Sequence, residues 1–248
     1  MWGFFVSPRA SIRMSMRIHI PDHILYEDDV IIVIDKPAGL MVEPDRNGHP
    51  NLLQQVRNYI KPSVPPGEEV YAQHIHRLDR PVSGVVLFAK QRTVLKNLSE
   101  QFAERKVKKY YQAITGQMPP IPNGRLEHWH RKEKKKAVLY ETELPYTEKA
   151  VLDYNVVPIS ENQFLWTIEL YTGKYHQIRA QLATLGCPVV GDMLYGSALV
   201  YKPDAIALRA SKLIFFHPVT NEAMDIDARL PFIASFLLYK KKQASGLN

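Results

Sequence analysis

The chain has 248 residues, enough for one large domain or two modest domains with a full hydrophobic core. Lysine and arginine outnumber aspartate and glutamate by 32 to 25, and the resulting charge of +7 favours a polyanionic partner, above all nucleic acid. The single cysteine, Cys187, excludes an internal disulfide and a cysteine-based zinc site, and it fits a reducing compartment. No apolar stretch reaches the length of a membrane span, so we expect a cytoplasmic protein with no membrane partner.

The two ends of the chain differ in composition from the rest. Residues 1–20 carry a short apolar patch followed by three arginines, and they are expected to form a loose basic leader. The patch is shorter than a signal-peptide core, and no basic residue precedes it. Residues 240–248 begin with three lysines and are expected to be a frayed basic tail, which leaves 21–239 as the folded domain.

Hydrophobic periodicity and turn residues predict a strand-rich fold. In chain order, the predicted strands are 24–26, 30–34, 85–89, 110–115, 151–158, 164–171, 207–216 and 224–228. The predicted helices are 51–60, 93–106 and 175–185, with Asn51 and Thr93 as N-caps and Gly186 as a stop. No glycine- or serine-rich linker divides the chain. The pattern predicts an α+β fold, a single domain on a mixed, mainly antiparallel sheet with flanking helices.

Two further features have both structural and functional interpretations. The basic run 131–136 is either the solvated tip of a hairpin or a loop that contacts phosphates. Two pairs of alternating histidines, His74 with His76 and His128 with His130, would each share one face of a strand. No cysteine or carboxylate pattern completes either pair to three or four ligands, so no metal site is expected.

A polar cluster of His76, Arg77, Asp79 and Arg80 lies directly before a turn and the apolar strand 85–89. A carboxylate between two guanidiniums is costly in such a place unless it is paired, so it is either a structural ion pair or a prepared reactive acid. A carboxylate beside a guanidinium stays ionised, which suits a nucleophile or base better than a general acid. The sequence around it resembles a kinase catalytic loop only superficially, because the Gly-rich loop and the Asp-Phe-Gly triplet are absent.

Several segments resemble the motifs of the RluA family of pseudouridine synthases. The segment from His76 to Gly84 resembles the family's His-Arg-Leu-Asp signature with its Ser-Gly turn. The other matching segments, which follow the family's order, are Asp35–Gly39, Lys109–Ala113, Thr172–Arg179, Gly186–Pro188, Gly191–Gly196 and His217–Pro218. The resemblance spans about Ile24 to Ile233, nearly the whole chain.

The resemblance implies a role for each matching residue. Asp79 would be the catalytic aspartate, Tyr111 the active-site tyrosine, and Arg179 the arginine that pairs with Asp79. Arg77 would also occupy the space left by a flipped uridine. The residues expected to bind RNA in a central cleft are His76, Arg77, Arg80, Lys109, Lys174, His176 and Gln177.

The sequence departs from the family pattern at four positions. Lys174 stands where arginine is usual, Gln181 and Arg209 where histidine is common, and Val82 where threonine is usual. We expect these departures to affect substrate contacts or packing, not the chemistry. The family's optional S4-type RNA-binding domain has no room in this chain.

The implied reaction is the isomerisation of uridine to pseudouridine in a tRNA or rRNA stem-loop. The reaction is redox-neutral and needs no cofactor, and no obligate protein partner is evident, so a monomer is expected. Asp79 would either attack the ribose or remove a ribose proton, and the sequence leaves both open. Tyr111 would accept or relay the proton that leaves C5 of the base.

Two other function classes remain as alternatives. One is a non-catalytic RNA-binding module, although a pure binder has no need of an ionised carboxylate facing an anionic ligand. The other is a metal-dependent nuclease built on Asp79 and Asp192, which would require magnesium and cleave the strand.

Overall fold

The computed structural model describes residues 16–229 and 232–244. Within these residues one sheet of 11 strands runs in the order β1-β2-β4-β10-β5-β9-β8-β6-β7, with β11 paired to β10 and β3 paired to β4. Strands β4 and β10 are parallel, and the other described pairs are antiparallel. The predicted α+β class with a mixed, mainly antiparallel sheet is therefore confirmed.

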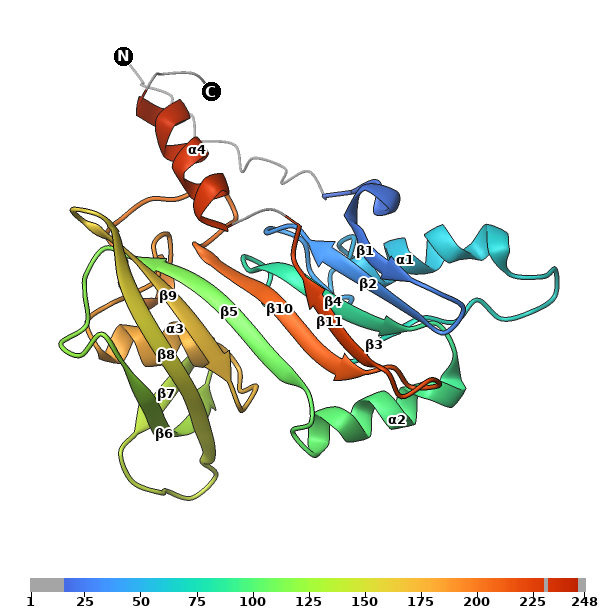
Figure 1. The fold of residues 1–248 in the computed structure, drawn as a ribbon, viewed down its shortest axis with the longest axis horizontal. Helices are drawn as coiled ribbons and strands as arrows, with labels where there is room; N and C mark the ends of the chain where they lie inside the picture. The colour runs from blue at the N-terminus through green and yellow to red at the C-terminus, as the bar shows by residue number, and fades with distance from the viewer. Residues whose placement is uncertain (1–15, 230–231, 245–248) are drawn as a thin grey trace, which may run out of the picture.

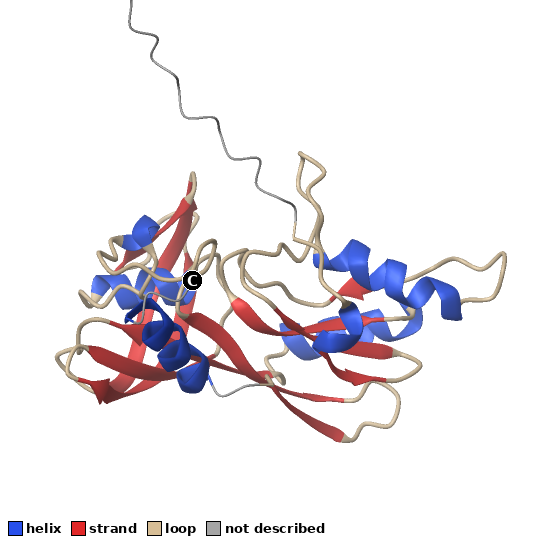
Figure 2. Ribbon diagram, turned by 90° about the horizontal axis from the view of Figure 1, so that it is seen from above, coloured by secondary structure: helices blue, strands red, loops and turns tan. Residues whose placement is uncertain are grey.

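The strands are β1 (Ile24–Glu27), β2 (Ile31–Lys36), β3 (Gln73–His74), β4 (Ser83–Ala89), β5 (Lys108–Thr115), β6 (Asn123–Glu133), β7 (Lys136–Tyr140), β8 (Glu148–Ser160), β9 (Gln163–Leu170), β10 (Leu208–Phe216) and β11 (Ala223–Asp227). The helices are α1 (Leu52–Ile60), α2 (Arg92–Ala103), α3 (Gln177–Thr184) and α4 (Phe232–Ala244), with short 3-10 turns at Ile20–His23, Lys61–Ser63 and Met193–Tyr195. Figure 1 shows α1 and α2 beside the β1–β4 end of the sheet and α3 beside the β6–β9 end. Figure 2 shows the helices gathered at these two ends, with loops over the middle. None of the helices that the structure describes is long and apolar enough to cross a membrane.

The helix boundaries test the predicted caps. Asn51 caps α1 as expected, because its side chain accepts a hydrogen bond from the Gln54 amide at 2.9 Å. The prediction for Thr93 is wrong: α2 begins one residue before it, and Gln91 occupies the cap position without a side-chain capping hydrogen bond. Helix α4 had no predicted counterpart and runs through Ala244, five residues into the expected tail. Residues 1–15 of the expected leader and 245–248 of the tail lie outside the described residues.

Strands β6 and β7 were also not predicted, and their sequences explain why. Charged residues interrupt the apolar alternation of β6, so its period-2 pattern is weak. The two strands nevertheless pair from Trp129 with Tyr140 to Glu133 with Lys136. The basic run 131–136 therefore spans the end of a hairpin, as its structural interpretation predicts, and its lysines are exposed.

Apolar packing covers both faces of the sheet at β2. Ile32 and Ile34 point into one cluster of buried residues, which also contains Leu52 and Val56 of α1. Ile31 and Val33 point into a second cluster that contains side chains of α2. A strand buried on both faces requires a continuous apolar run instead of alternation, and this explains the β-branched stretch in the sequence.

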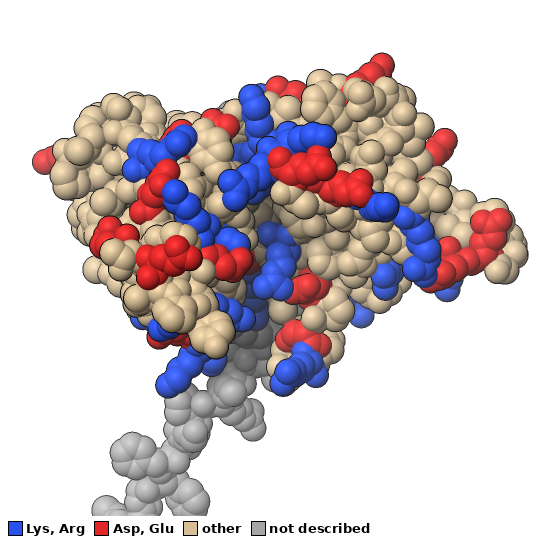
Figure 3. Space-filling model, turned by 90° about the horizontal axis from the view of Figure 1, so that it is seen from below, with Lys and Arg blue, Asp and Glu red and all other residues tan. Residues whose placement is uncertain are grey.

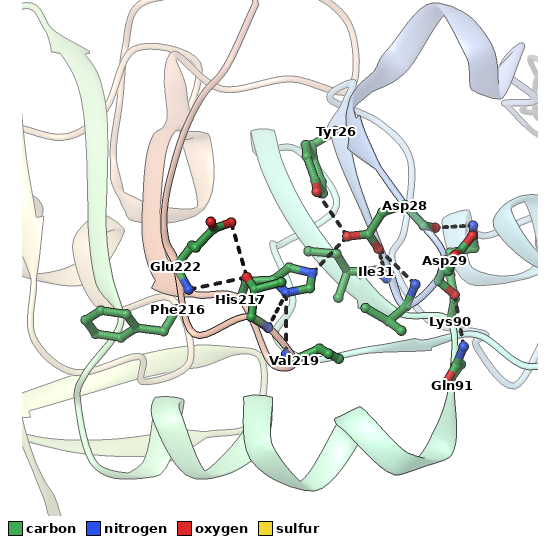
Figure 4. Close-up of polar contacts among 12 residues, drawn as sticks. Tyr26, Asp28, Asp29, Ile31, Lys90, Gln91, Phe216, His217, Val219 and Glu222 are labelled. Carbon is green, nitrogen blue, oxygen red and sulfur yellow. Dashed lines mark hydrogen bonds and ion pairs between the residues drawn. The ribbon is translucent and has the colours of Figure 1, made fainter.

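A polar network joins the far end of β10 to the turn between β1 and β2. Figure 4 shows His217 beside Asp28, with its Nε2 2.8 Å from Oδ2 of the carboxylate. The backbone amides of Val219 and Thr220 approach Nδ1 of the same ring, so Nδ1 accepts and Nε2 donates. Asp28 in turn accepts hydrogen bonds from the amides of Val30 and Ile31, at the start of β2. The closing His-Pro motif is therefore a structural clamp.

The imidazole of His76 also supports the fold. Its ring stacks on Phe102 of α2 with 5.1 Å between ring centroids, and its Nε2 accepts a hydrogen bond from the Leu87 amide of β4 at 3.2 Å. Burial lowers the pKa of His76 to about 3, and the charges of Lys109 and His74 lower it further in the same direction. A neutral His76 thus joins α2 to β4.

Gly84 permits the close approach of β4 and β10. It pairs with Ala210 in the parallel register and adopts φ of +117°. A Cβ at this position would lie 2.1 Å from the Ala210 carbonyl oxygen, well inside van der Waals contact. Only glycine fits here, five residues after Asp79 in the chain.

We predict that Gly84→Ala lowers the free energy of unfolding by about 3 kcal/mol, because overpacking adds to backbone strain. Gly48→Ala is the matched control: φ is +69° there, but nothing lies within 4 Å of the added Cβ. Strain alone should cost that variant about 1 kcal/mol. Urea denaturation measures both, and equal losses would contradict the packing argument.

We also predict that acid destabilises the fold through His76. The folded protein binds this proton more weakly than the unfolded chain does, so the free energy of unfolding falls as pH is lowered from about 6.5 toward 3. His76→Gln should reduce the steepness of that loss in urea denaturation at stepped pH, whereas replacing the exposed His19 should leave it unchanged. Identical slopes for His76→Gln and the parent protein would show that the ring is not held neutral.

Candidate active site

Asp79 lies in the loop between β3 and β4, at the meeting point of two cavities. The loop is anchored by the buried side chains of Leu78 and Val82, and the Val82 amide bonds to the Asp79 carbonyl at 3.0 Å. One cavity, of about 80 Å³, is also lined by Tyr111 of β5. The second, of about 260 Å³, extends past Arg77. The carboxylate is one quarter exposed, so it is accessible but largely desolvated.

Arg179 of α3 holds this carboxylate from a distance of 100 residues along the chain. Its Nη1 donates to Oδ2 of Asp79 at 3.0 Å. Its Nε and Nη2 donate to the two oxygens of Asp192 at 2.6 and 2.9 Å. Arg179 and Asp192 are both almost fully buried, and the guanidinium fork matches the second carboxylate in a bidentate pair. The pairing of Asp79 with Arg179 that the sequence suggested is present.

Asp192 is a site residue that the sequence analysis considered only as a metal ligand. Its place in the Gly191–Gly196 motif was the available signal. The guanidinium of Arg179 lies between Asp192 and Asp79, so the two carboxylates of the nuclease alternative already share a cation. In the part of the chain that the structure describes, no group of three or more histidine, cysteine, aspartate or glutamate side chains could hold a metal ion.

Tyr111 is buried in β5 and lines the smaller cavity together with Asp79. Burial raises the pKa of Tyr111 far above its usual value, and the negative charge of Asp79 raises it further. The side chain is therefore a neutral phenol at neutral pH. It can donate a proton or relay one, but it is not present as a phenolate that could act directly as a base.

The neighbouring arginines of the sequence cluster have other partners. Arg77 is exposed and forms an ion pair with Glu43. Arg80 donates from Nε to the Gly39 carbonyl at 3.0 Å, and its own carbonyl accepts from the Gly39 amide at 2.8 Å. The partner of Asp79 is therefore Arg179 and not an adjacent arginine.

Lys36 also belongs to the site, although no role for it was predicted from the sequence. Its ammonium group is fully buried and donates to the carbonyls of Pro37, Leu40 and Arg80 at 3.0, 2.7 and 3.3 Å. Burial lowers the pKa of Lys36 to about 7, although the charge of Asp79 opposes the shift. The lysine ties the loop after β2 to the loop that carries Asp79.

The remaining residues expected to bind RNA fall into two groups. His176 and Lys174 line the smaller cavity, and Lys174 forms an ion pair with Glu148. Lys109 lies at the edge of this cavity, 3.6 Å from where a Cβ on Gly173 would be, and burial lowers its pKa to about 8. Gln177 also lines this cavity, but its side chain, like that of His76, bonds within the protein, so the geometry favours structural roles for both. The oxygen of the Gln177 amide accepts from Thr172, and its nitrogen donates to Gln181.

Two departures from the family pattern have structural partners. Gln181 donates to backbone carbonyls of β6 and β8, which joins α3 to the sheet. Arg209 donates to Asp35 at 2.6 Å. Both support the expectation that these departures affect packing and not the reacting groups.

Basic side chains also gather around the cleft. Figure 3 shows lysine and arginine side chains along a hollow that crosses one face of the molecule. Such a charged hollow favours a polyanionic ligand.

Comparison with known proteins identifies the chain. The model of the RNA pseudouridylate synthase family matches residues 30–184. The dual-specificity RNA pseudouridine synthase RluA of Escherichia coli is 34% identical over 217 residues, covering 84% of this chain and 93% of that protein. An RNA pseudouridine synthase of Bacillus subtilis, YhcT, is 32% identical over 84% of this chain and 68% of its own length.

Solved structures agree on the fold. Human RNA pseudouridylate synthase domain containing 4 superposes with a TM-score of 0.71 at 24% identity, covering 89% of this chain and 94% of that chain. Human RNA pseudouridylate synthase domain containing 1 gives a TM-score of 0.70 at 20% identity, covering 86% and 85%. The extent of these matches shows that the chain belongs to the RNA pseudouridine synthase family, a family of isomerases, and that its relatives are of the RluA type.

Proposed function

We propose that the protein converts uridine to pseudouridine in a tRNA or rRNA stem-loop, with Asp79, Tyr111 and Arg179 as its catalytic residues. The observation that carries the proposal is the array of Asp79, Arg179 and Asp192 beside Tyr111 at one cavity. A carboxylate paired with a buried cation, next to a buried phenol, supplies a nucleophile or base and a proton carrier. The catalytic domain would act as a monomer without a cofactor.

The two oxygens of Asp79 have different surroundings. The polar contacts from described residues go to Oδ2, which Arg179 holds and His176 approaches. Oδ1 is therefore the oxygen available to attack the ribose or to remove a ribose proton. Either route breaks the N1–C1′ bond of uridine, and the uracil then turns so that C5 bonds to C1′.

Tyr111 would act on the last proton. Once the new C–C bond has formed, a proton must leave C5 of the base. A neutral phenol accepts that proton only while it passes its own proton to another base, so Tyr111 would serve as a relay. Its ring would also stack on the uracil.

The RNA would bind across the basic hollow. The uridine must leave its stack to reach Asp79, and Arg77 is exposed beside the larger cavity, where it could fill the vacated space. Lys106, Lys108 and the hairpin run 131–136 would contact phosphates. A relative in Buchnera aphidicola is named ribosomal large subunit pseudouridine synthase C, which supports rRNA as one candidate substrate.

Mapping of pseudouridine in total tRNA and rRNA from cells with and without the gene tests the substrate. The proposal expects one or a few sites to disappear with the gene. Purified protein incubated with bulk RNA, with and without EDTA, separates the alternatives. Pseudouridine would support this proposal, no change would support an RNA-binding module, and EDTA-sensitive fragments would support a nuclease.

We predict that Asp79→Asn lowers the rate of pseudouridine formation by at least about 1,000-fold, because the variant lacks the anionic oxygen. RNA binding should be retained, as measured by filter binding. Asp22→Asn is the control, since that carboxylate is exposed away from the cavities. Normal turnover by Asp79→Asn would remove Asp79 from the mechanism.

We predict that Tyr111→Phe lowers kcat by about 100-fold or more with little change in KM, because the ring remains but the proton relay is lost. Tyr110→Phe is a matched control: the adjacent tyrosine lines a different cavity. Single-turnover assays with tritiated uridine in the RNA would measure release of the C5 proton. A Tyr111→Phe rate equal to that of the parent protein would exclude the hydroxyl from the reaction.

A further inference from the structure

His176 lies against the reactive carboxylate in a strained conformation. Its Nε2 is 3.5 Å from Oδ2 of Asp79, and its side chain is only 9% exposed. Its backbone adopts φ of +53°, the left-handed region that β-carbon-bearing residues rarely occupy, immediately before α3. Such strain persists only where the surrounding structure fixes the residue, and it often accompanies function.

Two tyrosine rings hold the imidazole of His176 in place. The ring stacks on Tyr175 with 3.8 Å between centroids, and Tyr195 meets it edge-on at 5.7 Å. Both tyrosines contact the basic hairpin of β6 and β7. His130 of β6 contacts the Tyr175 carbonyl at 2.8 Å, and the Ala137 amide of β7 donates to the Tyr195 hydroxyl at 2.8 Å.

These contacts favour one position for the ring proton of His176. The Tyr195 oxygen accepts the Ala137 N–H and lies 3.0 Å from Nδ1 of His176, within reach of its own O–H as a donor. When Nδ1 accepts that O–H, the ring proton resides on Nε2, the nitrogen that faces Asp79.

The charges around the ring agree with a neutral imidazole. Burial lowers the pKa of His176 to about 4; Asp79 and Asp192 oppose that shift, and Arg179 and Lys132 reinforce it. A neutral imidazole with its proton on Nε2 would place an N–H 3.5 Å from Oδ2 of Asp79 without adding a positive charge, beside the charged donor of Arg179.

We propose that His176 is a positioning residue for Asp79, and that the β6–β7 hairpin sets its Nε2–H tautomer through the Tyr195 hydroxyl. The inference rests on the proposed function of Asp79. With Arg179 bonded to Oδ2 and His176 3.5 Å from the same oxygen, rotation of the carboxylate would be restricted and Oδ1 presented to the ribose. Because the hairpin carries the basic run 131–136, RNA phosphates that bind it would act on the same tyrosines that hold the ring.

A pair of substitutions separates this role from RNA binding. His176→Phe keeps the stack on Tyr175 but removes the N–H, and it should lower kcat by about 10- to 100-fold while KM for RNA stays constant. His176→Gln places an amide N–H near the Nε2 position and should restore much of the rate. His19→Phe, on the exposed surface, should match the parent protein. A rise in KM at constant kcat would make His176 an RNA contact, and equal loss in the Phe and Gln variants would make it merely structural; either result overturns the proposal.

A second measurement does not depend on activity. Nitrogen NMR of protein labelled with ¹⁵N-histidine should show His176 protonated on Nε2 and bare on Nδ1 at neutral pH. Tyr195→Phe should shift that ring toward a mixture of tautomers, while His217, whose Nδ1 accepts backbone amides, serves as the unchanged reference. A proton on Nδ1, or no change in Tyr195→Phe, would refute the tautomer assignment even if Asp79 proves essential. Absence of pseudouridine with the parent protein would instead refute the proposed function and leave this test standing.

Discussion

The candidate site depends on the ion pairs that the guanidinium of Arg179 forms with Asp79 and Asp192. A buried cation must be compensated, and here two carboxylates compensate it together, because Asp192 accepts two N–H groups and Asp79 accepts one. Asp192 is held by a tight loop, because its carbonyl accepts the amides of Tyr195 and Ser197. The arginine therefore cannot turn away, and it offers Asp79 a donor at a fixed position.

This ion array explains why distant segments of the chain have to meet. Asp79 precedes β4, Arg179 belongs to α3, and Asp192 lies between α3 and β10. Strands β4 and β10 form the only parallel pair among the described strands, and this pairing brings the segments of Asp79 and Asp192 together. Gly84 allows the close approach that the pairing requires. Lys36 adds a link from the other side by binding the Arg80 carbonyl. The sheet topology thus determines where the carboxylate of Asp79 lies.

Sequence patterns predicted the elements whose burial is regular and failed where tertiary contacts decide. The apolar run of β2 and the Asn51 cap are local signals, and both predictions are confirmed. The predicted N-cap at Thr93 was wrong because any Ser or Thr near the start of a helix resembles a cap. Helix α2 instead begins where its apolar face meets β4. The sequence could not assign partners to Asp192 and Lys36, because a hydrophobic pattern does not show which segments of the chain meet in the fold. The resemblance of its motif is what singled out Arg179 as the partner of Asp79 over the adjacent Arg77 and Arg80.

The protonation states of the site agree with a reaction that moves a proton within one base. Conversion of uridine to pseudouridine removes a proton from C5 and adds one at N1, so no net proton is gained or lost. Burial keeps Tyr111 a neutral phenol and His176 a neutral imidazole, while Arg179 pairs with Asp79 and Asp192 between them. In the proposed mechanism Tyr111 returns the proton that it receives. A phenolate in its place would compete with Asp79 for Arg179, and an imidazolium at His176 would compete with Arg179 for Asp79. Burial of the two rings therefore preserves the ion array beside them.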